Sequence, residues 1–282
     1  SYIVEEGKKR NIPSCLITFD PNPFYVLSDK KTPINLQSLD IKLETLKEIG
    51  LDKVLIIPFD KEFSLMSSQM FAETVLKDLF NPTIISVGTN HYFGHKKEGN
   101  FEFLKAFCSD NNIELHTPDM RKHMGSTISS SLIRSLILDG NSSKVYDYLG
   151  RFYGFNATVV SGSNRGKKMN YPTANFIPTF ENQLLPSTGV YLTKVFLDGK
   201  SYFGMMNAGV RPTFNEKKFV MEVHILSDKF GHLYDKNFYI EFLDKIRDEK
   251  KFDSKELLIK QIEKDKEVCI ELIDTFKEKY EI

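Results

Sequence analysis

Two patterns of hydrophobic and polar positions divide the chain near residue 140. In the first part, short apolar runs alternate with segments in which apolar side chains recur every three or four positions. The short runs predict buried parallel strands, and the recurring spacing predicts amphipathic helices between them. The predicted strands are 14–19, 53–59 and 82–87, and the predicted helices are 38–49, 67–80, 100–111 and 128–138. This alternation is typical of an open α/β domain, whose ligands bind at the carboxyl ends of the strands.

The second part alternates apolar and polar positions with a period of two, which predicts strands. The predicted strands are 153–161, 189–197, 200–206, 219–226 and 237–243. Asp198-Gly199, between two of them, is a strong signal for a tight hairpin turn. Several short strands of this kind favour a small closed β-barrel. We expect the seam between the two parts at 141–145, which gives predicted domains of residues 1–143 and 144–282.

A long helix is predicted at the end of the chain. Asp253 and Glu256 form a capping box at its start. An apolar stripe then follows at three- and four-residue steps through Leu258, Ile262, Asp265, Cys269, Leu272 and Phe276. Such a stripe is typical of core packing. Asp265 is the polar member of the stripe, so its carboxylate is expected either at the solvent edge or hydrogen-bonded.

Composition and charge exclude several classes of protein. A chain of 282 residues is long enough for two domains with separate cores. Its 38 basic and 38 acidic residues balance, so no general positive field attracts nucleic acid or an anionic membrane. No apolar run approaches the ~20 residues that span a bilayer, and no secretory signal is visible. Cys15, Cys108 and Cys269 lack metal-ligand spacing, which favours reduced thiols and a cytoplasmic protein.

The segment from Ser161 to Phe176, SGSNRGKKMNYPTANF, carries the densest chemistry of the chain. A loop of this composition can turn backbone N–H groups and cationic side chains toward phosphate oxygens. It is not a Walker A loop, because its glycines are one residue too close and Lys168 takes the place of the hydroxyl residue. The alternative is an ordinary charged hairpin loop. The phosphate-binding candidates are Gly162, Arg165, Gly166 and Lys167, with Lys168 as a further cation.

These residues, read with motifs elsewhere in the chain, carry a resemblance to a known family. PTAN at 172–175, after Gly162-x-x-x-Gly166, resembles the signature of riboflavin kinases. Further kinase motifs follow in order: GVY at 189–191, NAGVRPTF at 207–214, MEVHIL at 221–226, LYDK at 233–236 and RDEKKFDS at 247–254. In the first part, TFDPNP at 18–23, VGTNHYFG at 87–94 and ISSSLIR at 128–134 resemble the FMN adenylyltransferase half of bacterial FAD synthetases.

Nearly the whole chain therefore resembles the bacterial bifunctional riboflavin kinase/FMN adenylyltransferase family. The resemblance implies a Rossmann-like nucleotidyltransferase domain with a parallel sheet, followed by a small Greek-key-type β-barrel and a long helix. It also implies the substrates and products riboflavin, FMN, FAD, ATP and ADP, with Mg²⁺ as the cofactor. No nucleic acid or membrane partner is expected, and the sequence predicts no oligomeric state.

Within the kinase half, the resemblance assigns Thr173 and Asn175 to the metal and, with Pro172, to the ATP phosphates. Without the resemblance, the residues favour a turn that Thr173 and Asn175 close after Pro172. Glu222 shares one face of its predicted strand with His224, while apolar side chains occupy the other face. An acid in such surroundings is either a general base beside the acceptor hydroxyl or a solvent-facing acid on an edge strand. The resemblance favours Glu222 as the base.

A second group of kinase residues, Arg247 and Phe252, precedes the last helix. In the family this segment borders the flavin. The residues alone also fit a charged turn that enters a helix.

In the adenylyltransferase half, the resemblance assigns Asn90 to nucleotide binding and Ser130, Ser131 and Arg134 to the triphosphate at a helix N-terminus. The resemblance also implies that Asn22 faces the adenine site, because the family often has histidine at that position. Without the resemblance, the serines fit helix caps and Arg134 a surface charge. The family opens with a strand and a Gly-x-Phe-Asp-Gly-x-His-x-Gly-His segment, whereas this chain begins inside the helix expected to follow it.

The sequence therefore predicts two activities, phosphorylation of riboflavin to FMN and adenylylation of FMN to FAD. One alternative is a riboflavin kinase whose first half is degenerate. A second is a flavin-sensing regulator without turnover, and a third is a nucleic-acid-binding barrel, which the balanced charge disfavours.

Overall fold

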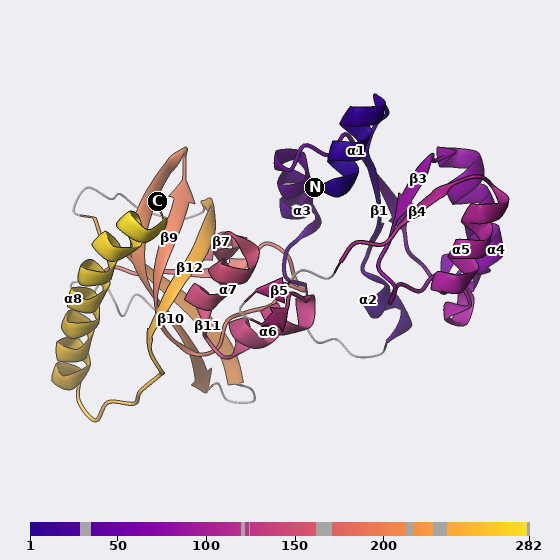
Figure 1. Ribbon diagram of the computed structural model, residues 1–282. Helices are drawn as coiled ribbons and strands as arrows, with labels where there is room; N and C mark the ends of the chain where they lie inside the picture. The colour runs from indigo at the N-terminus through magenta and orange to yellow at the C-terminus, as the bar shows by residue number, and fades with distance from the viewer. Residues whose placement is uncertain are drawn as a thin grey trace. The chain divides into compact units, whose positions relative to one another are not determined.

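The computed structural model describes residues 1–28, 35–119, 122–123, 125–161, 171–212, 217–227 and 236–280. Their packing divides them into two compact units (Figure 1). Within these ranges, the first unit holds the residues up to Ser28 and from Leu39 to Thr127, and the second holds 35–38 and the residues from Ile128 onward. No helix in the described ranges combines the length and apolar character needed to cross a bilayer.

Parallel strands form the centre of the first unit. β1 (Cys15–Asp20) pairs with β2 (Lys53–Pro58), and β3 (Ile84–Ser86) pairs with β4 (Glu114–His116). β1, β2 and β3 are the strands that the apolar runs predict, whereas β4 is an additional strand. Their parallel pairing confirms the α/β class of this unit. Among the described residues the four strands form two separate pairs and not one continuous sheet.

Helices lie around these strands at the predicted positions. α1 (Tyr2–Arg10) precedes β1, α3 (Leu39–Glu48) precedes β2, and α5 (Phe101–Asp110) precedes β4. The predicted helix at 67–80 is an α-helical turn, α4 (Ser68–Phe71), that continues as a π-helix, η2 (Ala72–Phe80). Ala72 and Leu104 join these helices in one apolar cluster with Phe107 and Cys108. The shorter elements are α2 (Pro23–Leu27), η1 (Phe63–Leu65), η3 (His95–Lys97), β5 (Lys122–His123) and β6 (Ser126–Thr127).

The second unit is a closed antiparallel barrel with strand order β10-β11-β8-β7-β12-β9 (Figure 1). Its strands are β7 (Tyr153–Val160), β8 (Ala174–Pro178), β9 (Gly189–Leu197), β10 (Lys200–Pro212), β11 (Lys217–Ile225) and β12 (Asn237–Arg247). The barrel is the predicted one, and β8 is an additional strand in a segment that the sequence suggests as a turn. Asp198 and Gly199 both have positive φ, as the hairpin between β9 and β10 requires.

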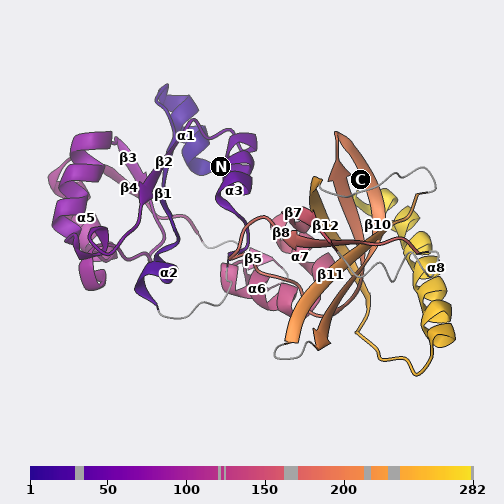
Figure 2. The ribbon, with the colours of Figure 1, turned by 180° about the vertical axis from the view of Figure 1, so that it is seen from behind.

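The inward faces of the strands fill the barrel with large side chains, among them Phe155, Phe176, Tyr191 and Phe242, each no more than 1% exposed. The long helix α8 (Lys255–Tyr280) packs on the outside of the barrel (Figure 2). Its buried side chains Cys269 and Phe276 share an apolar cluster with Val190, Leu192 and Leu243 of the strands. Its start is capped one residue later than predicted, because the Ser254 hydroxyl accepts the N–H of Leu257.

Two further helices belong to the second unit, α6 (Ser130–Leu138) and α7 (Ser142–Leu149). Ile133 and Ile137 of α6 and Val145 of α7 are part of the barrel core. The segment expected to be a seam is therefore a packed helix that ends at Gly150 (φ 69°). The packing contacts divide the chain into its two units after Thr127. The sequence instead places the domain boundary between residues 143 and 144. As the boundary between the two functional domains, 143/144 stays a prediction.

Residues 35–38 also belong to the second unit. Asn35 forms a parallel β-bridge with Gln183, and Gln37 accepts a hydrogen bond of 2.6 Å from Arg151. The buried Gln183 amide donates to the Leu36 carbonyl (3.2 Å) and to the Tyr153 hydroxyl (2.7 Å). A short segment far from the barrel in sequence is thus built into the polar part of its core.

Candidate functional site

Three polar side chains form a row across the outer face of the barrel. Asn175 of β8 lies opposite Glu222 of β11, and Glu222 lies opposite Asn207 of β10. Register partners in an antiparallel sheet project to the same side, so the three side chains are neighbours. Val160 of β7 and Val190 of β9 continue the register at the two ends of this polar row.

The Glu222 carboxylate is fixed from the side of β8. The Thr173 hydroxyl donates a hydrogen bond of 3.2 Å to Oε2 of Glu222. Asn175 is only 9% exposed, whereas Asn207 is exposed. The structure therefore brings together Thr173, Asn175 and Glu222, which the resemblance assigns to one kinase site.

His224 holds the chain just before Thr173. Its Nδ1 lies 2.8 Å from the carbonyl oxygen of Pro172, so this nitrogen carries the proton and donates. Burial lowers the pKa of His224 below 6.5. The ring also contacts the Tyr171 ring at a centroid distance of 5.5 Å. Because His224 and Glu222 are two positions apart on β11, the 171–173 segment is attached to the strand that carries the predicted base.

Arg247 and Phe252, the predicted flavin residues, lie close to each other. Arg247 is opposite Val190 in the register of β12 and β9, so it extends the polar row around the barrel. Its guanidinium carbon is 5.8 Å from the centre of the Phe252 ring. The same guanidinium forms an ion pair of 2.7 Å with the buried Asp265 of α8. Of the two expectations for Asp265, the structure therefore confirms the hydrogen-bonded one.

Contacts at Gly209 show that the polar row and the segment with Arg247 and Phe252 are neighbours. A Cβ at this glycine would lie 2.6 Å from Oε1 of Glu249, so the side chain of Glu249, in the segment after β12, reaches β10. Gly209 is two residues beyond Asn207 on the same face of the strand. The segment that contains Arg247 and Phe252 therefore adjoins the polar row.

Sequence reasoning missed three members of this region, Asn207, Glu249 and Asp265 as the partner of Arg247. The signal for Asn207 was present, because period-two alternation puts it on the face opposite the buried Met206 and Ala208. Glu249 and the ion pair of Asp265 depend on contacts that sequence spacing does not report. The phosphate candidates Gly162, Arg165, Gly166 and Lys167, together with Lys168, lie outside the described residues.

The donor set of the polar row fits a hard divalent cation. A hydroxyl, an amide oxygen and a carboxylate converge from Thr173, Asn175 and Glu222. Magnesium prefers oxygen ligands of this kind, together with phosphate oxygens of a nucleotide. In the part of the chain that the structure describes, no group of three or more His, Cys, Asp or Glu residues offers a metal site made by protein alone.

The adenylyltransferase candidates of the first unit follow the ends of strands, as predicted. Asn22 lies two residues after β1, where its side-chain oxygen accepts the Phe24 N–H (3.0 Å) and caps α2. Asn90 is exposed and follows β3. Lys42, which sequence reasoning missed, donates to the Thr18 hydroxyl of β1 (2.5 Å), and burial lowers the pKa of this lysine.

The remaining adenylyltransferase candidates lie in the second unit. Ser130 and Ser131 are exposed in the first turn of α6, and Arg134 lies one turn further on. The helix cap is Ser129, whose hydroxyl accepts the Leu132 N–H at 3.2 Å. Ser130 and Ser131 are thus not the capping residues, and their exposed hydroxyls flank a helix N-terminus suited to anions.

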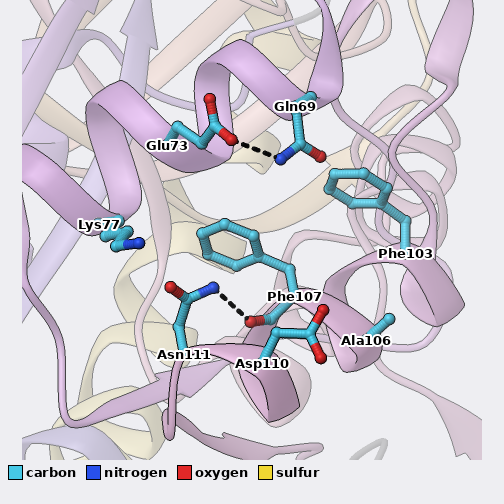
Figure 3. Close-up of a pocket in the computed structure, with 8 residues that line it drawn as sticks. All are labelled: Gln69, Glu73, Lys77, Phe103, Ala106, Phe107, Asp110 and Asn111. Atoms are coloured by element: carbon cyan, nitrogen blue, oxygen red, sulfur yellow. Dashed lines mark hydrogen bonds between the residues drawn. The ribbon is translucent and has the colours of Figure 1, made fainter.

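A small cavity of about 180 Å³ lies between η2 and α5 in the first unit (Figure 3). It is lined by Gln69, Glu73, Lys77, Phe103, Ala106, Phe107, Asp110 and Asn111. Two of its polar groups are satisfied locally, since Gln69 donates to Glu73 and Asn111 donates to the Phe107 carbonyl. None of the sequence-predicted site residues lines this cavity, so it plays no part in the candidate site.

Comparison with known proteins identifies two families along the chain. Residues 1–132 match the family described as FAD synthetase, and residues 149–273 match the family described as riboflavin kinase. The two matches divide the chain into the same halves as the sequence motifs.

Curated relatives and a solved structure match nearly the whole chain. The bifunctional riboflavin kinase/FMN adenylyltransferase of Escherichia coli (strain K12) is 32% identical over 93% of this chain and 83% of its own length. The protein of the same name from Listeria monocytogenes is 31% identical over 94% of this chain and 85% of its own length. A crystal structure described as that of a macrolide-efflux protein from Streptococcus pneumoniae has a TM-score of 0.85 and 29% identity, covering 94% of this chain and 86% of that chain.

Proposed function

Because this chain belongs to the bifunctional riboflavin kinase/FMN adenylyltransferase family, we propose that it makes FMN from riboflavin at the polar row of the barrel. In this reaction the 5′-hydroxyl oxygen of riboflavin forms a bond to the γ-phosphorus of ATP, and the bond between that phosphorus and the bridging oxygen to ADP breaks. The hydroxyl proton needs an acceptor within hydrogen-bond reach. Glu222 is that acceptor in our proposal.

The observation that carries the proposal is the contact between Thr173 and Glu222. A hydroxyl that donates to one carboxylate oxygen at 3.2 Å favours a single orientation of the carboxylate. Asn207, opposite Glu222 in the polar row, is exposed on the outer face of the barrel. A positioned carboxylate beside an acceptor hydroxyl is the arrangement that general-base catalysis requires.

Magnesium is the cation that the oxygen donors of Thr173 and Asn175 fit. When bound with ATP, it would neutralise charge on the phosphate oxygens. Thr173 and Asn175 would hold it from one side, and the buried position of Asn175 fixes that side. His224 contributes indirectly, because its bond to the Pro172 carbonyl keeps Thr173 in place.

The other kinase residues complete the substrate sites in this proposal. Gly162, Arg165, Gly166, Lys167 and Pro172 bind the ATP phosphates. On the far side of the row, Arg247 and Phe252 border the flavin, which is supported by the close approach of their segment to Gly209.

For the second activity we propose that FMN attacks the α-phosphorus of ATP and expels pyrophosphate. Asn22 and Asn90 would bind the nucleotide, and Ser130, Ser131 and Arg134 would stabilise the phosphates. The support is local: Asn22 and Asn90 follow strand ends, and the serines flank a helix N-terminus whose backbone N–H groups favour anions.

The test of the kinase proposal is Glu222→Gln, which keeps the shape of the side chain but removes the base. FMN formation should fall by about 10²-fold or more, while nucleotide binding stays nearly intact. Glu181→Gln, at an exposed acid outside the polar row, is the matched control and should be as active as wild type. If Glu222→Gln turns over as fast as this control, Glu222 is not the base.

A further inference from the structure

Asp265 is the residue of α8 that the apolar packing of the helix does not explain. It is 3% exposed, and its neighbours in the stripe, Ile262 and Cys269, pack against the barrel. A carboxylate in such a position is costly unless its charge is paired and its oxygens are hydrogen-bonded. Asp265 therefore has a specific partner.

That partner is Arg247, the last residue of β12. Nε of Arg247 donates to both carboxylate oxygens of Asp265 at 2.9 Å, and Nη2 donates to Oδ2 at 2.7 Å. Gln261, one turn earlier on α8, donates to Oδ1 at 2.8 Å. This forked geometry fixes the guanidinium in direction as well as in position.

The same guanidinium holds the beginning and the end of the segment 248–252. Nη1 of Arg247 donates to the Asp248 carbonyl at 2.9 Å, and the guanidinium carbon is 5.8 Å from the centre of the Phe252 ring. Between these two contacts, Glu249 lies against Gly209. Arg247 thus contacts both ends of the segment from which the Glu249 side chain reaches β10.

We infer that Asp265 is a positioning residue for flavin binding: through Arg247 it fixes the segment 248–252 beside the polar row. The inference rests on the proposed function, in which this segment borders the flavin. Arg247 itself then acts by holding the segment and not by offering its charge to a ligand. Its side chain is 15% exposed, its charge is already matched by Asp265, and three of the five N–H groups of a guanidinium are donated within the protein.

The decisive variant is Asp265→Asn, which keeps the volume of the side chain. It removes the negative charge and replaces one of the two acceptor oxygens by an NH₂ group. Riboflavin and FMN affinity can be measured by titration of flavin fluorescence, which is excited in the visible where protein side chains do not absorb. We expect the Kd for FMN and the KM for riboflavin to rise about 10-fold or more. The KM for MgATP and the kcat at saturating riboflavin should stay within about twofold of wild type.

Cys269→Ala is the matched control on the same stripe. Cys269 is 0% exposed and packs against the barrel one turn after Asp265, so its truncation loosens the same helix without touching Arg247. Flavin affinity should stay at the wild-type value in this control. If Cys269→Ala weakens flavin binding as much as Asp265→Asn does, the effect is general to helix packing and the inference is wrong.

Two further variants keep the test decisive if Asp265→Asn does not fold. Arg247→Lys retains the charge but loses the planar fork, so it should show the same flavin defect. The double variant Arg247→Met/Asp265→Leu replaces the buried pair by apolar side chains, which often restores stability. It should melt near wild type and still bind flavin weakly; restored flavin affinity would overturn the inference.

Failure of the inference differs from failure of the proposed function. If wild type converts riboflavin to FMN and Asp265→Asn binds flavin as tightly as wild type, the positioning role is refuted and the kinase stands. If folded wild type forms no FMN from riboflavin, the proposed function is refuted, whatever the flavin titrations give.

Discussion

Glu241 shows how one half-buried side chain makes the stability of this protein depend on pH. It lies on β12 opposite Lys194 of β9 and Gly154 of β7. Burial raises the pKa of Glu241 from 4.5 to about 7, and the charges of Lys194 and Arg151 oppose this only in part. Between these two pH values the folded chain holds a proton that the unfolded chain has released. The free energy of unfolding should therefore fall as pH rises from about 4.5 to about 7, by up to about 1.4 kcal/mol per pH unit.

Glu241→Gln should abolish this fall and stabilise the protein at pH 8 relative to wild type. Urea unfolding followed by circular dichroism at pH 5 and at pH 8 measures the difference for both chains. The exposed Glu181→Gln is the control and should keep the wild-type dependence. An unchanged loss of stability between the two pH values in Glu241→Gln would contradict this assignment.

At the residue scale, the sequence predicts types of position better than partners. The place of Asp265 in an apolar stripe predicts that its carboxylate needs an explanation, yet Arg247 lies 18 positions earlier and only the packing of α8 on the barrel joins them. The row of Asn175 and Glu222 follows from the resemblance, whereas the position of Asn207 opposite Glu222 requires the strand register. Ser254 and Asp253 are both good caps, so sequence alone does not choose between them.

At the scale of elements, the segment 35–38 belongs to the second unit, although it lies far from the rest of that unit in sequence. The sequence alone does not predict this. The buried Gln183 amide connects it to the Tyr153 hydroxyl, which in turn donates to the Leu184 carbonyl. Gln183→Ala should lower the free energy of unfolding of this unit by about 1–3 kcal/mol, because it leaves buried polar groups without partners. Urea unfolding measures the loss.

Asn182→Ala is the control for this prediction, because it keeps the backbone carbonyl that accepts the Asn35 N–H. Equal unfolding midpoints for Gln183→Ala and Asn182→Ala would show that the Gln183 amide contributes nothing specific.

Most strands and helices follow from hydrophobic periodicity, and the exceptions have physical causes. β8 is short and begins with Ala174 directly after Pro172 and Thr173, so turn residues mask a strand that only pairing with β7 and β11 makes evident. The sequence predicts a seam at 141–145, but this segment begins α7, where Val145 is 0% exposed and packs in the barrel core. Local pattern does not report such tertiary contacts.

At the scale of the whole molecule, the two activities should be separable by mutation. Arg134→Ala should weaken ATP use in FAD formation by about 10-fold or more, the effect of losing a charged hydrogen-bond donor. FMN formation from riboflavin should stay at the wild-type rate. Steady-state assays with FMN and with riboflavin as the starting flavin measure the two effects, with Arg134→Lys as the conservative control. Loss of the kinase activity instead would refute this division of labour.

The division into two units follows from the change of hydrophobic period, but its boundary does not. α6 carries the ISSSLIR motif of the adenylyltransferase half, whereas its apolar side chains Ile133 and Ile137 pack in the barrel core. The motif thus assigns α6 to the adenylyltransferase half, whereas packing assigns it to the kinase half. Only the motif can be recognised in the sequence.

The most direct test of the account is chromatographic analysis of the products that this chain forms from riboflavin, ATP and Mg²⁺, beside Glu222→Gln. The account predicts ADP in an amount equal to the sum of FMN and FAD from wild type, and a loss of all three products in the variant. A parallel reaction that starts from FMN reports the adenylyltransferase separately, as FAD and pyrophosphate. Folded wild-type protein that binds flavin and ATP but yields no FMN would contradict the central claim that the polar row transfers phosphate to riboflavin.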